Sequence, residues 1–350
     1  MKDFLKKLVE TCSPSGDEKD GINLWDNECE KLKGEGIRKY YSDKMGNSAW
    51  AWGNGSTKIL ISGHVDEICM AVNYIDESGY IVLSNMAGID LKVLPGSQLL
   101  LVTQKEIIRG VIVSVPIHIY WGEDKKDDVT PIDELRVDIG AESKEEVIEM
   151  GVNIGIPVVF ERNVMMKFGK NRLVGNALDD KAGVAVVYNV LKKLNSELPK
   201  ELKEKITVIG LATVGEESGL RGAMVAAKNI NADISIDIDV TYADCGLYNK
   251  EKYGDVKLGK GVIIEYGQDK SRRLSDKLKD ICEKEGISYQ LSNSRCGGTN
   301  TDMIQLMSED CETTLLSLPL TSLHTQNETM DWRDLEGCSE LILKYISSEF

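Results

Sequence analysis

Residues 67–164 differ in pattern from the sequence on either side of them, and this difference determines the fold that we expect. On both sides, segments with helical periodicity alternate with short β-branched runs, which predicts an α/β domain with a mostly parallel central sheet flanked by helices. Inside 67–164 the pattern is that of short strands, with a hairpin turn at Glu77–Gly79. We therefore expect one discontinuous domain, 1–66 and 165–350, and a small inserted β-barrel-like domain.

Periodicity and end signals place the expected elements along the chain. Helices are predicted at 2–12, 18–33, 180–195, 220–228, 271–285 and 332–347, and strands at 57–62, 206–214, 234–240, 261–265 and 313–318. In the inserted segment, strands are predicted at 68–76, 80–84, 107–121 and 156–161. A single helix there begins at the capping box Ser143–Glu146.

The net charge and the distribution of apolar residues exclude several classes of protein. The formal net charge is −15, so nucleic acid and anionic membrane surfaces would repel the chain. No stretch approaches the roughly 20 apolar residues that span a bilayer, and residues 1–10 resemble an amphipathic helix more than a signal peptide. The eight cysteines include no C-x-x-C pair, which favours buried thiols over disulfides or zinc ligands. We expect a cytoplasmic protein that binds neither nucleic acid nor membrane.

Candidate metal ligands gather where the predicted strands end. His64 closes an apolar run and is followed two residues later by Asp66, so both side chains point to the same side of a strand. Acidic residues follow the same placement at Asp179–Asp180, Glu216–Glu217 and Asp237–Asp239. In open α/β sheets, ligands bind at the carboxyl ends of the strands. A cation there would offset the cost of burying several carboxylates, so the sequence predicts a two-metal hydrolase site.

Each candidate taken singly has an ordinary structural explanation. His64 would be a strand-end histidine, Asp179–Asp180 a helix N-cap pair, and Glu216–Glu217 a solvated pair that complements a helix dipole. His118 is expected to have a structural role. Gly297–Asp302 lacks the lysine and the helix pattern of a phosphate-binding loop. The shared placement of the acidic groups favours the metal site over these separate explanations.

These residues resemble the tetrahedral (TET) aminopeptidases, which are cytosolic di-zinc exopeptidases that include glutamyl, leucyl and lysyl aminopeptidases and members once labelled cellulases. The similar stretches follow the family's order along nearly the whole chain. They are Gly63–Ile68, Gly88–Asp90 with Leu94–Gly96, Val137–Glu146, Gly175–Gly183, Glu216–Ala223, Asp239–Thr241 and Pro319–Glu328.

The resemblance implies two divalent metal ions, Zn²⁺ most readily and Co²⁺ as the alternative. Their ligands would be His64, Asp179, Glu217, Asp239 and His324. Asp179 would bridge both ions. His64 and Asp239 would complete one metal site, and Glu217 and His324 would complete the other.

The resemblance also implies roles for neighbouring carboxylates. Glu216 would be the general base, and Asp66 would orient His64. Asp180 would shape the turn after Asp179 through an unusual peptide geometry. Asp237 is left open as a carboxylate that supports the metal site or caps a helix, and Asp239 is preferred as the ligand because it precedes Val240–Thr241, as in the family.

The implied function is an aminopeptidase that removes N-terminal residues from short peptides. Its inserted domain would form dimers, and the dimers would build a hollow tetrahedral dodecamer. Gly215 replaces the family's usual Gln, and Leu320–Leu323 replaces an Arg-Tyr pair, which leaves the preferred N-terminal residue open. Two other functions stay open: a metal-independent glycosidase that uses Glu216 and a second carboxylate, and a non-catalytic peptide-binding scaffold.

Overall fold

The computed structural model describes the whole chain except residues 87, 121–128 and 294–296. The chain forms two units. The first unit comprises Met1–Glu67, Val164–Leu323 and Asn327–Phe350, and the second comprises Ile68–Asn163 with His324–Gln326.

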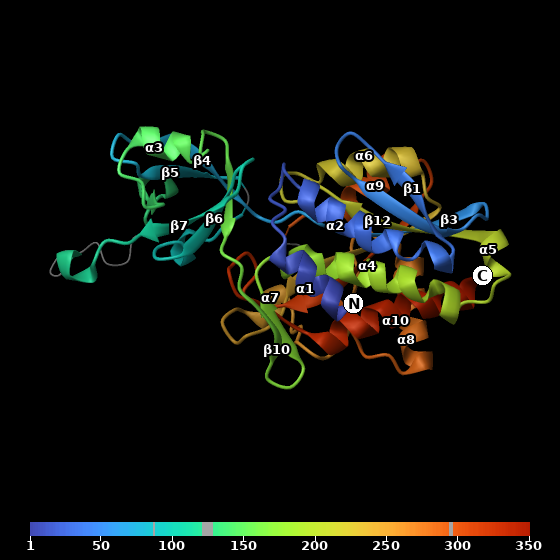
Figure 1. The fold of residues 1–350 in the computed structure, drawn as a ribbon. Coiled ribbons are helices and arrows are strands. Elements are labelled where there is room, and N and C mark those ends of the chain that lie inside the picture. The colour runs from blue at the N-terminus through green and yellow to red at the C-terminus, as the bar shows by residue number, and fades with distance from the viewer. Residues whose placement is uncertain (87, 121–128, 294–296) are drawn as a thin grey trace. The chain divides into compact units, whose positions relative to one another are not determined.

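An eight-stranded mixed sheet forms the centre of the first unit, in the order β1-β2-β12-β3-β13-β16-β14-β15 (Figure 1). The strands are β1 (Ile37–Ser42), β2 (Ser48–Gly53), β3 (Thr57–His64), β12 (Ile206–Thr213), β13 (Ile234–Tyr242), β14 (Val262–Glu265), β15 (Tyr289–Ser292) and β16 (Glu312–Leu320). The central strands β12, β3, β13 and β16 run parallel. Strand β2 is antiparallel to β1 and β12, and β14 is antiparallel to β16.

Helices cover both faces of this sheet. The longer helices are α1 (Lys2–Glu10), α2 (Lys19–Glu30), α4 (Leu178–Glu197), α6 (Arg221–Ile230), α8 (Arg272–Glu285), α9 (Asn300–Met307) and α10 (Trp332–Glu349), and α5 (Leu202–Lys205) and α7 (Lys250–Tyr253) are single turns. Helices α4, α8 and α10 pack on one face, whereas α6 and α9 pack on the other (Figure 1). A sheet covered on both sides explains why its central strands are buried along nearly their whole length.

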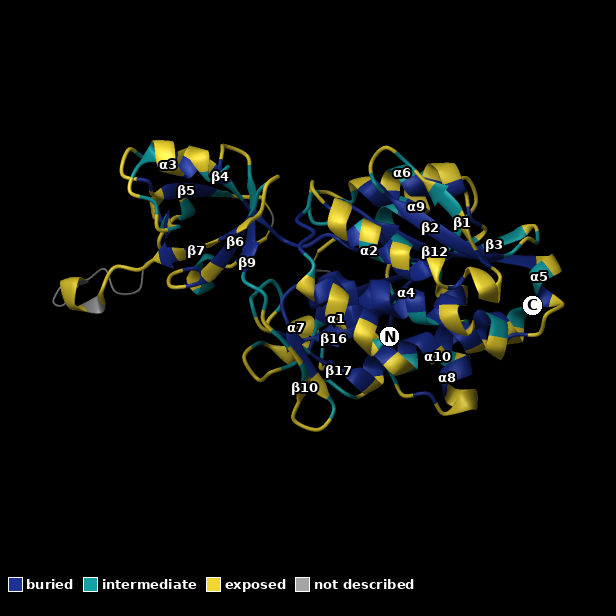
Figure 2. Ribbon diagram, viewed as in Figure 1, coloured by how far each residue is buried: buried dark blue, intermediate teal, exposed yellow. Residues whose placement is uncertain are grey.

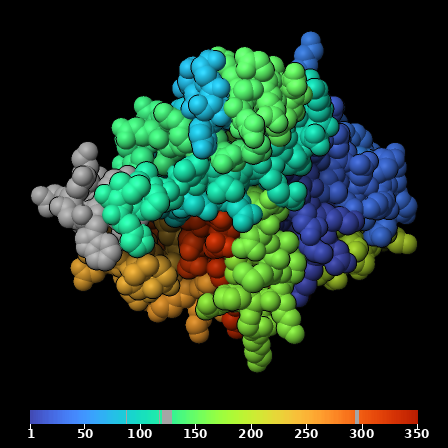
Figure 3. All heavy atoms as spheres, turned by 60° about the vertical axis from the view of Figure 1, so that its left-hand side comes forward, coloured from blue at the N-terminus to red at the C-terminus, as the bar shows by residue number. Residues whose placement is uncertain are grey.

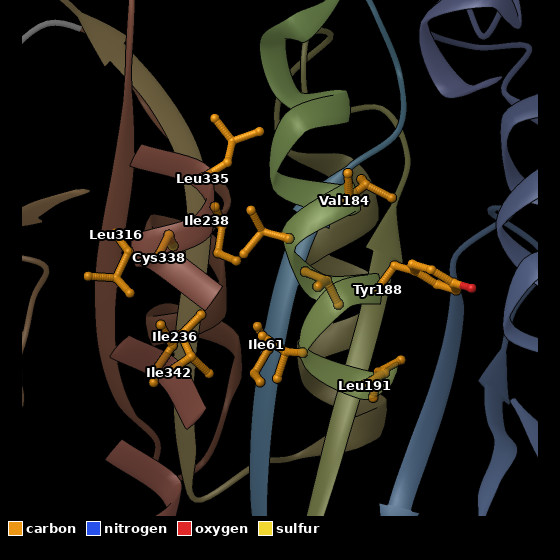
Figure 4. Packing of buried hydrophobic residues seen from close by; sticks show 14 of the residues in the cluster. Ile61, Val184, Tyr188, Leu191, Ile236, Ile238, Leu316, Leu335, Cys338 and Ile342 are labelled. Atoms are coloured by element: carbon orange, nitrogen blue, oxygen red, sulfur yellow. The ribbon is translucent and has the colours of Figure 1, made fainter. Parts of the chain in front are cut away.

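Alternate residues of the central strands enter different hydrophobic cores. In β3, Ile61 packs toward α4, where it lies among Val184 and Leu191 (Figure 4). Its neighbour Leu60 belongs to the core on the α6 and α9 face. Figure 2 shows β3 and β12 as buried, while the outer faces of the helices are exposed. Because side chains alternate along a strand, this arrangement decides which face each polar residue of β3 joins.

A small antiparallel sheet completes the first unit. It consists of β10 (Val164–Phe168), β11 (Arg172–Gly175) and β17 (Glu328–Asp331), in that order. The turn between β10 and β11 projects from the surface at the bottom of Figure 3. Strand β11 leads directly to the start of α4, so this sheet fixes the segment that carries Asp179.

The second unit is a closed six-stranded barrel, in the order β4-β5-β8-β7-β6-β9. Its strands are β4 (Met70–Ile75), β5 (Ile81–Asn85), β6 (Gln98–Val102), β7 (Ile107–Val113), β8 (Arg136–Asp138) and β9 (Pro157–Phe160). Closure leaves no free edge in the barrel. Strand β7 alternates between buried and exposed residues and turns apolar side chains outward at Ile107, Val111 and Val113.

The helix α3 (Lys144–Glu149) of this unit begins after Ser143, as the sequence predicts. Ser143 Oγ accepts a hydrogen bond from Glu146 N at 3.3 Å. The Glu146 carboxylate reaches back one residue further than a standard capping box and accepts from Glu142 N at 2.8 Å. His324–Gln326 join the second unit because Gln326 Nε2 donates to Ser97 Oγ and His324 bonds to Gly88.

The structure confirms the predicted helices and the predicted parallel strands, with boundaries shifted by a few residues. The strand predicted at 107–121 is too long: β7 ends at Val113, a 3₁₀ turn follows at Ile117–Tyr120, and residue 121 lies outside the described residues. Pro116, which lacks a backbone N–H, stands between these two elements. Strands β1, β2, β6, β8, β10, β11, β15 and β17 were not predicted.

The described cysteines are thiols and not disulfides, as expected. Most of them are buried, Cys311 is half-buried and Cys245 is exposed. Cys296 lies outside the described residues. Within the described part of the chain, no helix combines the length and the apolar composition needed to cross a membrane.

Candidate active site

His64 is the last residue of β3, and its ring is buried among carboxylates. Its Nδ1 lies 3.1 Å from the carbonyl oxygen of Asp66, which can only accept, so in the neutral ring Nδ1 carries the proton. The other nitrogen, Nε2, lies 3.1 Å from Asp179 Oδ1, 3.8 Å from Glu216 Oε2 and 3.9 Å from Asp239 Oδ1. In the neutral ring Nε2 has no proton, and a cation between it and these carboxylate oxygens would stabilise the arrangement.

Asp179 and Asp180 stand where α4 begins, and neither has helical backbone angles. The peptide bond between them is cis, which confirms the unusual geometry predicted there. Asp180 accepts from His64 N at 3.2 Å and from Gly183 N at 2.9 Å, so its carboxylate supports the backbone. Gly63 permits this approach, because a Cβ on it would lie 2.8 Å from Asp180 Oδ2. Asp179 is left as the member of the pair that faces His64.

Asp66 connects His64 with the two glutamates that follow β12. Its side chain is fully buried. One carboxylate oxygen accepts from Glu216 N and the other from Glu217 N, each at 3.1 Å. The same residue therefore orients the His64 ring through its carbonyl group and the glutamate loop through its carboxylate.

Asp237 and Asp239 lie on one side of β13, but only Asp239 approaches the ring of His64. Asp237 accepts from Ser62 Oγ at 2.6 Å and from Thr301 Oγ1 at 3.2 Å, which explains its burial without a metal. The prediction that these acids end a strand is wrong, since β13 continues to pair with β16 as far as Tyr242. Asp237 is thus held by hydroxyl groups of β3 and α9, and a role beside the metal site stays a prediction.

Burial makes the charged forms of these acids unfavourable. Burial raises the pKa of Glu216 to about 8 and holds the pKa of Asp180 and Asp239 well above the usual range. Burial alone would lower the pKa of His64, but the negative charges around it outweigh this effect and raise its pKa. The site thus contains more buried negative charge than its own residues balance.

The donor set fits divalent metal ions. Ligand atoms of His64, Asp179 and Asp239 lie within 4.8 Å of one another, and so do those of His64, Glu216 and Glu217. One imidazole nitrogen combined with carboxylate oxygens suits Zn²⁺, and Co²⁺ accepts the same donors. A bound cation would also balance the buried carboxylates that carry raised pKa values.

The remaining histidines belong to the second unit. His324 Nδ1 lies 2.9 Å from the carbonyl oxygen of Gly88, so Nδ1 donates and Nε2 is the unprotonated nitrogen of the neutral ring. That tautomer is the one a metal-binding histidine needs, and a ligand role for His324 stays a prediction. His118 is exposed on the 3₁₀ turn of the barrel unit.

A cavity of about 750 Å³ lies beyond Asp239 in the first unit. Val240 and Thr241 line one part of it, and Gly297 and Thr299 line another. No helix was predicted after this glycine-rich stretch, but α9 starts at Asn300. Its first turn, Asn300–Asp302, consists of residues with poor helix propensity, which concealed it.

Comparison with known proteins decides the family. Residues 47–341 match the M42 glutamyl aminopeptidase family. The chain belongs to this family. This M42 chain is 29% identical over 342 residues to the lysyl aminopeptidase of Pyrococcus furiosus, covering 97% of this chain and 94% of that protein.

Solved structures agree with the family. The TET1 peptidase of Pyrococcus horikoshii, described as assembling into a tetrahedron or a large octahedral shell, matches with a TM-score of 0.86 and 31% identity over 99% of both chains. The TET aminopeptidase of Thaumarchaeota archaeon SCGC AB-539-E09 matches with a TM-score of 0.90 and 26% identity, over 99% of this chain and 96% of that one. These findings confirm the predicted family and fold, and they place this M42 chain among peptidases.

Some supporting residues of the site were not predicted. Glu328, at the start of β17, accepts from Asp179 N at 3.2 Å. Ser62 and Thr301 hold Asp237, and Asn47 and Glu18 contact the glutamate loop. These contacts join segments that are far apart in the chain, so no local pattern in the sequence predicts them.

Proposed function

We propose that this M42 family member is a metal-dependent aminopeptidase that removes N-terminal residues from short peptides. The observation that carries this proposal is the buried His64 ring, whose Nε2 faces the carboxylates of Asp179, Asp239 and Glu216 at 3.1, 3.9 and 3.8 Å. The cluster lies at the edge of parallel strands where α/β enzymes bind their ligands.

Two divalent ions, Zn²⁺ or Co²⁺, would be held by the ligands that the family resemblance implies. These are His64, Asp179, Glu217, Asp239 and His324, with Asp179 shared between both ions. The tautomers of both histidines support this proposal, because each ring donates through Nδ1 to a carbonyl oxygen and keeps Nε2 for a cation.

The roles of the chain's own groups follow from their positions. Bound divalent ions would supply acidification of a water molecule and polarisation of the scissile carbonyl. Glu216, whose carboxylate reaches the same cluster, would accept the proton of the attacking water and deliver it to the leaving nitrogen. Asp66 would keep Glu216 and Glu217 in place through their backbone amides.

We also propose assembly into dimers through the second unit and further into a cage. Outward-facing apolar residues on β7, namely Ile107, Val111 and Val113, are between 43% and 49% exposed and would be covered in a symmetric dimer. A related structure is described as a dodecamer. Light scattering of the metal-loaded protein should give the molar mass of about twelve chains for the cage. A monodisperse monomer would refute the proposal.

The experiment that tests the activity uses a panel of aminoacyl-p-nitroanilides and short peptides. Purified protein is stripped with a chelator and then reloaded with Zn²⁺ or Co²⁺. We expect release of the N-terminal residue only in the reloaded samples, and no release from any substrate would contradict the proposal.

Two controls separate the alternatives. Hydrolysis of a β-glucan that survives the chelator would favour a glycosidase, which needs no metal. A folded protein that binds well under one metal per chain after loading would favour a scaffold.

A further inference from the structure

The loop that carries Glu216 and Glu217 is held by side chains along its backbone. Strand β12 ends at Thr213, so the next amides lose their partners in the sheet and need other acceptors. Val214 N donates to Asn47 Oδ1 at 3.2 Å and Gly215 N donates to Glu18 Oε1 at 3.1 Å. The next two amides donate to the oxygens of Asp66, as described above.

Glu18 makes an unusual contact among these acceptors, because one of its oxygens serves two segments. Oε1 accepts from Gly16 N at 2.7 Å as well as from Gly215 N. The side chain is 8% exposed and projects from the N-cap of α2. A second bond between the same two segments joins Ser15 Oγ and Ser218 Oγ at 2.8 Å. The turn before α2 therefore supports the glutamate loop directly.

Gly215, whose amide donates to Glu18, is the glycine directly before Glu216. Gly215 has φ +63°, in the left-handed region that glycine enters without penalty. A glycine at this position also has the largest choice of other conformations, and its backbone angles set the direction of Glu216. The bond to Glu18 restricts that choice.

We propose that Glu18 is a positioning residue for Glu216, acting through the acceptor oxygen that fixes the amide of Gly215. The inference rests on the proposed function, in which Glu216 is the general base. A displacement of a catalytic group by about 1 Å lowers a rate by up to about 100-fold. Glu18 touches neither substrate nor metal ligands in this assignment, so its effect is on geometry.

Two variants distinguish the effect of the hydrogen-bond acceptor of Glu18 from the effect of its negative charge. Glu18→Gln keeps an oxygen that can accept both amide bonds, whereas Glu18→Leu fills a similar volume without an acceptor. We expect Glu18→Gln to retain kcat within about 3-fold of the wild type and Glu18→Leu to lower kcat by about 10- to 100-fold. KM and bound metal per chain should be the same in both variants, because binding groups are unchanged.

Asp334 offers a matched control for general destabilisation. It is also buried, and it accepts from two glycine amides, Gly259 N and Gly261 N, each at 2.7 Å. Asp334→Leu should lower the melting temperature as Glu18→Leu does and leave kcat unchanged. An equal loss of kcat in Asp334→Leu and Glu18→Leu would overturn the proposal, because the effect would then be one of stability.

A second readout does not depend on activity. Hydrogen–deuterium exchange of peptides that contain residues 214–218 should be faster in Glu18→Leu and unchanged in Glu18→Gln. Wild-type exchange in Glu18→Leu would overturn the positioning role even if the enzyme were inactive on every substrate. If the wild type were inactive and exchange were faster in Glu18→Leu, the proposed function would be refuted, but the role of Glu18 in holding the glutamate loop would be supported.

Discussion

Lys181 and Glu67 form a buried ion pair, with Nζ and Oε1 2.9 Å apart and side chains 0% and 3% exposed. The ammonium group also donates to the carbonyl oxygen of Thr11 at 2.8 Å, and the carboxylate accepts from Ser13 N at 2.8 Å. Lys181 follows Asp180, and Glu67 follows Asp66. The pair therefore ties the start of α4 to the segment after β3, and both segments carry proposed site residues.

Removal of one partner should be costly. Lys181→Met would leave the Glu67 carboxylate buried without its cation, and we expect the free energy of unfolding to fall by about 3–5 kcal/mol. Urea unfolding followed by circular dichroism measures this change. The double variant Lys181→Met/Glu67→Leu should recover part of the loss, and equal stability of the single variant and the wild type would contradict the prediction.

Asp179→Asn should reduce metal content at both positions together, because a bridging carboxylate serves two ions. Elemental analysis after loading would show close to two ions per chain in the wild type and well under one in the variant. The matched control is Asp237→Asn, whose carboxylate is occupied by Ser62 and Thr301. A normal metal content in both variants would remove Asp179 from the ligand set.

Glu216→Gln should abolish most turnover while both metal ions stay bound. The amide cannot accept a proton, and loss of general-base catalysis lowers rates by about 10²- to 10⁴-fold. Steady-state kinetics on the best aminoacyl-p-nitroanilide, with metal analysis of the same sample, tests this. Turnover at the wild-type rate would exclude Glu216 as the base.

Asp334 should make stability depend on pH. Burial raises its pKa from 3.8 to about 6, so the folded state binds more protons than the unfolded state between these values. The contribution of this group to stability is then full below about pH 4 and is lost as the pH rises through about 6. Asp334→Asn cannot ionise, so the stability of the wild type relative to the variant should fall over that range. Urea unfolding of both proteins at several pH values tests the sign, and a relative stability that increases with pH would contradict it.

The elements that could be predicted from the sequence are those whose buried residues recur at the spacing of a helix or a strand. Strands β3 and β12 are apolar because both faces of the sheet are covered, and the long helices show a clear apolar face. Strand β2 was missed because Ser48–Gly53 is a short alternation of Ala and Trp bounded by polar residues. Helix α9 was missed because its first turn holds Asn300 and Thr301, which bond to Thr213 and Asp237 instead of showing a helical pattern.

For the candidate site, the sequence indicated which residues carry the chemistry but did not reveal what holds them. His64, Asp179 and Glu216 stand beside apolar runs, and that placement is visible in the sequence. Asn47 and Glu18 reach the glutamate loop from about 170 to 200 residues away along the chain. Contacts of this kind form only in the completed sheet, so the spacing of residues along the chain does not predict them.

The order of strands in the main sheet also limits when the chain can fold. Strands β2 and β3 are adjacent in sequence, yet β12 lies between them and pairs with both. A ribosome must therefore make the whole segment 68–163 and continue to Thr213 before the N-terminal strands find their partner. Until β12 is made, β2 can pair only with β1 and β3 has no partner in the sheet, so both strands present an open edge to wrong partners in that interval.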